Sequence, residues 1–152
     1  MSDPRKIDRA DAIQLLWPLV GPYTADSVVS ASAAISDLWR FLAHATLDSS
    51  PTENAPSDVY LMVNNLRASA HSAAQVLAQV ESWAVRLMGH QGLMHDGDRN
   101  DHDRAVSAAS AVADWLLRAC GDIGTVASDL GKASAPLSHL YIDLDDEDGE
   151  QG

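Results

Sequence analysis

The sequence is poor in the features that mark secreted and membrane-spanning proteins. It holds one cysteine, Cys120, in 152 residues, so no internal disulfide can form and a reducing compartment is expected. Nowhere do about 18 apolar residues follow one another, and the N-terminal stretch MSDPRKIDRADAIQ has no apolar run of signal-peptide length. We therefore expect a cytoplasmic protein that does not engage a membrane.

Catalytic signatures are missing as well. No phosphate-binding glycine loop, nucleophile elbow, HExxH motif or dinucleotide-binding turn occurs. Cys120 falls on an apolar repeat, which favours a small packed side chain over a nucleophile. We expect no enzymatic activity and no cofactor.

Positive charge is scarce. Ten basic residues face 22 acidic ones, a net charge of -12, and six of the acids crowd residues 143–152. The rest of the chain holds 16 acids and 10 bases, a net of -6. Binding to nucleic acid depends on neutralising phosphates, so direct nucleic-acid binding is not expected.

Helical periodicity is what the sequence does contain. Period-two alternation is absent, and apolar residues recur at spacings of three and four, which predicts an all-α protein. We expect helices over residues 8–20, 24–47, 57–88 and 101–135. Loops of about nine to thirteen residues favour antiparallel neighbours. The predicted architecture is an antiparallel up-down bundle of three long helices plus a short N-terminal helix, in one domain (1–142), followed by a disordered acidic tail (143–152).

Helix ends follow from local chemistry. Pro18 should stop or kink the first helix near Trp17, and Gly21-Pro22 should end whatever continues. Thr24 is expected to cap the second helix. Ser57 and Asp58 suit the start of the third, and Asn100 or Asp101 the start of the fourth.

The residues of each long helix that form its apolar stripe, or seam, follow the three-four alternation of packed helices. In the second helix they are Val28, Ala31, Ile35, Leu38, Leu42 and Ala45. In the third they are Val59, Val63, Leu66, Ala70, Ala73, Leu77, Val80, Ala84 and Leu87. In the fourth they are Val106, Ala109, Ala113, Leu116, Cys120, Ile123, Ala127 and Leu130.

Small side chains dominate these seams. Alanine and serine supply 40 of the 152 residues, and the middle of the third helix is reduced to Ser69, Ala70, Ala73 and Ala74. Gly121 and Gly124 inside the fourth helix indicate either a bend or a close helix contact, and we expect this helix to approach the small-residue middle of the third. An alanine-rich seam buries less area than a leucine-rich one, so a homodimer is a hypothesis.

Three tryptophans, Trp39, Trp83 and Trp115, stand beside seam positions of the three long helices. They are expected to fill the half-buried flank of the core. The alternative is that they anchor a protein partner, because tryptophan is a frequent interface hot spot.

The segment 90–103 gathers the candidate metal ligands His90, His95, Asp96, Asp98 and His102. It half matches a calcium loop, but Asp101 stands where glycine is required and Ser107 where glutamate is required. No cysteine or helical histidine spacing supports zinc. We expect a solvated loop, with a metal-dependent function as an alternative.

The tail, with Asp145, Asp146 and Glu147, is expected to be a solvated end. Two alternatives are a docking segment for a basic partner and part of a type VII secretion signal, whose Tyr-x-x-x-Asp spacing Tyr141 and Asp145 satisfy.

Three segments, DLWRFLAHAT (37–46), PSDVYLMVNNLRASAHSAAQVLAQVESW (56–83) and DWLLRAC (114–120), resemble small helical proteins of high-GC actinobacteria. The excess of arginine over lysine, eight to two, fits that source. Some of these proteins accompany mobile elements, so the resemblance implies an accessory role and carries over no site residue.

These observations favour a non-catalytic helical bundle that acts through protein–protein contacts, as an oligomeric scaffold or an accessory subunit whose protein partner is unknown. An acidic regulator, which occupies a basic partner or a nucleic-acid site by charge mimicry, is the second hypothesis. It predicts contiguous acids on the folded body and salt-sensitive binding.

Overall fold

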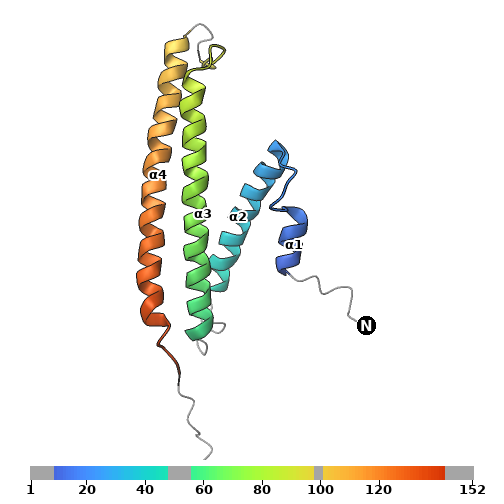
Figure 1. Cartoon of the computed structure of the whole chain (residues 1–152), viewed down its shortest axis with the longest axis vertical. Coiled ribbons are helices and arrows are strands. Elements are labelled where there is room, and N and C mark those ends of the chain that lie inside the picture. The colour runs from blue at the N-terminus through green and yellow to red at the C-terminus, as the bar shows by residue number, and fades with distance from the viewer. Residues whose placement is uncertain (1–8, 48–55, 98–100, 143–152) are drawn as a thin grey trace, which may run out of the picture. The chain divides into compact units, whose positions relative to one another are not determined.

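The computed structural model describes residues 9–47, 56–97 and 101–142. Its elements are four helices, α1 (Arg9–Leu16), α2 (Ala25–Ala45), α3 (Pro56–Met88) and α4 (His102–Leu137), and no strand element lies between them in these residues (Figure 1). The all-α prediction is confirmed. The chain divides into two compact units, residues 1–51 and 52–152, and each is described by itself.

In the first unit, α1 is shorter than the predicted 8–20 because Pro18 follows it closely. The last helical residue is Leu16, and the Trp17 amide still donates to the Ile13 carbonyl at 2.8 Å. A residue before proline is disfavoured in the helical conformation, which ends the helix there. Gly21 then takes a positive φ of 78° ahead of Pro22. The expected stop near Trp17 is confirmed.

Helix α2 begins as predicted, at a capping box. The Ser27 amide donates to Thr24 Oγ1 at 3.1 Å, and the Thr24 amide donates to Ser27 Oγ at 3.0 Å. Two amides of the first turn are thereby satisfied. None of its residues is buried, and Val28, Ile35 and Leu38 of its apolar stripe are each more than half exposed.

The second unit is an antiparallel hairpin of α3 and α4, which lie side by side along their lengths (Figure 1). Helix α3 begins with Pro56, one residue before the predicted start, because a proline in the first turn lacks only an amide that has no helical partner. Helix α4 is capped by Asp101, whose carboxylate accepts from the Arg104 amide at 2.8 Å. It continues through Pro136 to Leu137, two residues beyond the expected end.

The seam between α3 and α4 agrees with the predicted alternation. Every predicted seam residue of α4 is buried or half-buried, and on α3 only Val80, at 40%, counts as exposed. The buried side chains of the described residues are all small: Ala84, Ala105, Ala109, Ala113, Ala127 and Ser134. Two helices cover only one side of each seam, so the larger residues extend partly to the flanks.

Helix α4 approaches the small-residue middle of α3, as expected, but Gly121 and Gly124 do not make the close contact themselves. A Cβ built on either glycine would meet nothing within 4 Å. Each glycine directly follows a seam residue, Cys120 or Ile123, and one helical step of about 100° turns it to the flank. Cys120 makes the contact instead, with its Sγ 3.3 Å from the Ala74 carbonyl oxygen.

Candidate interaction surface

The loop end of the hairpin holds a hollow between α3 and α4. It has a volume of about 210 Å³ and opens to the surface. Ten residues from three consecutive segments line it: Trp83, Ala84, Leu87, Leu93, Met94, His95, Ala105, Ala108, Ala109 and Val112. None of them carries a formal charge with histidine neutral, so the hollow is an apolar site.

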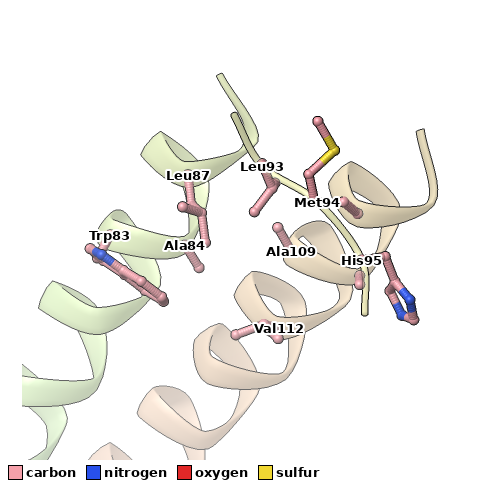
Figure 2. Close-up of a pocket in the computed structure, with 10 residues that line it drawn as sticks. Trp83, Ala84, Leu87, Leu93, Met94, His95, Ala109 and Val112 are labelled. Carbon is pink, nitrogen blue, oxygen red and sulfur yellow. The ribbon is translucent and has the colours of Figure 1, made fainter. Parts of the chain in front are cut away.

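The hollow follows from the sizes of the seam residues. Ala84, Ala105 and Ala109 are almost fully buried where the two helices meet, and their side chains end at Cβ. Trp83 and Val112 stand on the adjacent flank and form the walls (Figure 2). Small groups between larger ones leave a space that the hairpin itself does not fill.

The segment that connects α3 to α4, described over residues 89–97, closes one end of this space. In Figure 2, Leu93 points between the helices, whereas the His95 ring points away from α3. Two contacts hold Leu93 in place. His102 Nδ1 lies 3.0 Å from the Leu93 carbonyl oxygen, and the Leu93 amide donates to the His90 carbonyl at 3.0 Å.

Two of the candidate metal ligands, His90 and His95, accept hydrogen bonds from nearby backbone amides. His90 Nδ1 accepts from the Gly92 amide and His95 Nδ1 from the Gly97 amide, each at 3.1 Å. His95 Nδ1 also lies 3.5 Å from Asp96 Oδ1. Because this nitrogen accepts the Gly97 hydrogen bond, it cannot also donate to Asp96, and we do not count the two residues as an ion pair. Asp98 lies outside the described residues. No group of three histidine, cysteine or acidic side chains in the described segments could hold a metal ion.

Two of the three tryptophan candidates lie on the hairpin and one lies in the other unit. Trp83 is 52% exposed and Trp115 66%, and Trp39 on α2 is 49% exposed. The Arg118 guanidinium lies 5.2 Å from the centre of the Trp115 ring, close enough for a cation–π contact. The structure brings Trp83 to the hollow and places Trp115 one helical turn beyond Val112.

Val112 and the connecting-segment residues Leu93 and Met94 were missed at the sequence level. One signal was available: residues directly before the seam of α4 are apolar at a spacing of seven, namely Ala105, Val112, Ala119, Val126 and Ala133. A second apolar row beside the seam predicts a contact with something besides α3. Leu93 and Met94 gave no such signal, because they stand in a loop.

The acidic candidates are only partly placed. Asp145, Asp146 and Glu147 lie outside the described residues. Within the helices of the hairpin, the acids of α4, Asp103, Asp114, Asp122 and Asp129, are separated by seven residues or more, and Asp129 is paired with Lys132 at 2.7 Å. The described body of the hairpin therefore has no continuous acidic row.

The one buried polar side chain in the described segments is that of Ser134, and the ionisable side chains of His95, His102 and Cys120 are half-buried. None of the helices in these segments is long and apolar enough to cross a membrane. Comparisons with protein-family models, curated proteins and solved structures found no match to this chain.

Proposed function

We propose that this chain is a non-catalytic helical protein that acts through protein–protein contacts, as a scaffold or an accessory subunit. The observation that carries the proposal is the apolar hollow at the loop end of the hairpin, flanked by the half-exposed Trp83. Tryptophan in an apolar, water-excluding site is the usual core of a binding surface. The resemblance to small actinobacterial proteins supports a cytoplasmic accessory role linked to a mobile element.

We also propose that α2 packs against α3 and α4, so that the three long helices form an antiparallel bundle. Its support is the apolar stripe of α2, none of whose residues is buried. Such a stripe stabilises a protein only when another element covers it. At 1.5 Å per residue α2 is about 32 Å long and α3 about 50 Å, so α2 can cover at most about two thirds of α3.

The contact function is tested by affinity capture of the full chain from its source cells, with cross-linking. We expect a partner that the unchanged chain retains, that Trp83→Ser retains at least about tenfold less, and that Trp39→Ser retains fully. Trp39 is a matched control because its exposure, 49%, is close to the 52% of Trp83. Equal retention by both variants would contradict a role for this surface.

The same capture separates the contact function from charge mimicry. A partner held by the acidic tail is lost when residues 143–152 are removed. It is also lost when salt rises from about 0.1 M to about 1 M, where the screening length falls from about 10 Å to about 3 Å. A partner held by the apolar hollow survives both changes.

A further inference from the structure

Each helix of the hairpin carries a second row of uncharged residues, one position before its seam. On α3 the row is Met62, Ser69, Val76 and Trp83, and on α4 it is Ala105, Val112, Ala119, Val126 and Ala133. The two rows share one side of the hairpin, since Trp83 and Val112 both line the hollow. We name these two rows the apolar side. Val76 and Val126, well away from the hollow, are 54% and 51% exposed.

The opposite side of the hairpin is polar by comparison. The residues one position after the seam are Asn64, His71, Ala78 and Val85 on α3, and Ser107, Asp114, Gly121, Ser128 and Ala135 on α4. Arg67 lies on this side too, because its Nε is 3.1 Å from where a Cβ of Gly131 would be. A third helix packed there would take charged groups out of water, which costs free energy. Packing on the apolar side avoids this cost.

Helix α2 has a stripe that matches the apolar side. Val28, Ile35 and Leu38 of the stripe are each more than half exposed. The ion pair of α2 points elsewhere: Asp37 and Arg40, 3.0 Å apart, are each well exposed, and Asp37 stands two helical steps, about 200°, from Ile35. The stripe and the apolar side are both uncharged and both uncovered. Burying one against the other removes apolar area of both from water.

The covalent link between the two units favours α2 over a second copy as the helix that covers this side. Residues 46–55 join α2 to α3, and at about 3.6 Å per residue they reach about 36 Å at most. A short link of this kind holds its two ends at an effective concentration of about 1 mM. A second copy at about 1 µM is roughly a thousandfold more dilute, so α2 occupies the apolar side in its place.

The same link sets the register of α2. It joins the end of α2 to the start of α3, so a packed α2 runs antiparallel to α3. With its 21 residues, α2 then extends along α3 from Pro56 to about Val76. Ile35, in the middle of α2, comes level with about Leu66 to Ser69. Trp83 lies beyond the reach of α2.

The register extends to α4 through a contact across the seam. Cys120 Sγ lies 3.3 Å from the Ala74 carbonyl oxygen. Because α3 and α4 are antiparallel, Val126, six residues after Cys120, is level with the residues about six before Ala74. That is the level of Ile35 in a packed α2. Val112, eight residues before Cys120, is level with the hollow instead.

We propose that α2 packs on the apolar side of the hairpin, with Ile35 against Val126, and ends before the hollow. This inference rests on the three-helix bundle of the proposed function and names the side of the hairpin that α2 covers. Trp83 and Val112 stay uncovered. The surface left for a protein partner is therefore the part of the apolar side that α2 is too short to reach.

Thiol labelling of the full chain tests the coverage. In a Cys120→Ala background, Val126→Cys and Val112→Cys report on two valines of the same row, 51% and 45% exposed on the hairpin. A maleimide should label Val126→Cys at least about tenfold more slowly, because α2 must first open. Adding Ile35→Glu releases α2 and should bring the two rates within about twofold.

Disulfide formation tests the side. In the same background, Ile35→Cys combined with Val126→Cys should form a disulfide within one chain under mild oxidation, since this bond requires close Cα atoms. Ile35→Cys with Ser128→Cys is the matched control, because Val126 and Ser128 flank the buried Ala127 on opposite sides of α4. The control should react at least about tenfold more slowly.

Circular dichroism shows whether the variants are folded, and Cys120→Ser replaces Cys120→Ala if the latter loses its helix signal. Three results would overturn the proposal: equal labelling at the two valine positions, a disulfide that forms with Ser128→Cys as fast as with Val126→Cys, or no disulfide with either. Disulfides only between two chains, at twice 16.2 kDa, would also overturn it and assign the apolar side to a second copy.

Failure of the proposed function looks different. A bundle that uses another side of the hairpin would still be destabilised more by Ile35→Glu than by Ser36→Glu. The contact function would still be seen as capture of a partner that depends on Trp83, whichever side α2 covers.

Discussion

At the scale of single residues, the hairpin depends on where its smallest side chains lie. Among the residues that the structure describes, five alanines and Ser134 are buried, and no large side chain is fully buried. Two glycines of α4 differ in the space that a side chain would find there. Gly121 faces open space, whereas a Cβ at Gly131 would lie 3.1 Å from Arg67 Nε.

Gly121→Ala should raise the free energy of unfolding by about 0.5–1 kcal/mol, because alanine loses less backbone entropy in a helix and meets nothing here. Gly131→Ala should give a smaller gain, because Arg67 has to move from its place on the helix. Urea unfolding of both variants, followed by circular dichroism, checks the order. Equal gains would mean that Arg67 does not pack on Gly131.

Ala127→Leu should lower the free energy of unfolding by about 1–3 kcal/mol, because a larger side chain at a filled position forces the helices or neighbouring side chains to shift. Ala127 is 0% exposed. Ala111→Leu, at an exposed position of the same helix, is the control and should change stability by no more than about 0.5 kcal/mol. An unchanged melting temperature for Ala127→Leu would contradict the close packing of the seam.

At the scale of elements, short-range hydrogen bonds set the helix boundaries. The Thr24–Ser27 capping box and the Asp101 cap were both predictable, because each involves a side chain three residues from the amide that it binds. The end of α1 near Trp17 was also predictable, because Pro18 follows it. The end of α4 was less predictable, because Pro136 in its last turn left that helix intact.

Asp101→Ala should cost about 1 kcal/mol of stability, because the Arg104 amide loses its acceptor. Asp101→Asn keeps a capping oxygen without the charge and should cost only a few tenths of a kcal/mol. Thermal unfolding compares the two variants. A cost as large for asparagine as for alanine would show that the charge, and not the hydrogen bond, stabilises the start of α4.

At the scale of the whole molecule, the hairpin of α3 and α4 covers its apolar seams only in part. Only one side of each seam is covered by the other helix, and the stripe of α2 has no buried residue. The proposal that α2 supplies part of the missing contacts has its own test.

Ile35→Glu should destabilise the chain by about 2 kcal/mol or more if the stripe of α2 packs against other helices, since a carboxylate is then taken out of water. Ser36→Glu, the next residue on the same helix, lies off the stripe and is the control. Urea unfolding of the full chain measures both. If the two variants are equally stable, α2 does not add to the bundle through this stripe.

Much of this fold could be predicted from the sequence because helices are local structures. Apolar spacing in α3 and α4 predicted which residues meet, and Cys120 does contact Ala74 from the opposite helix. Gly121 and Gly124 make no close contact, because a position one residue off the seam turns away from the partner helix. Single-domain organisation and the tail residues Asp145, Asp146 and Glu147 stay predictions.

The sequence by itself determined the helical class, the Thr24 cap and the small residues of the seam, and it narrowed the cap of α4 to Asn100 or Asp101, since these features depend on residues within a few positions of each other. The hollow at the loop end was decided only by tertiary structure. Its walls come from Trp83, Leu93 and Val112, which lie on separate segments. A hollow is the space that remains after such side chains are packed, so it depends on the distances between helices, which no local pattern contains.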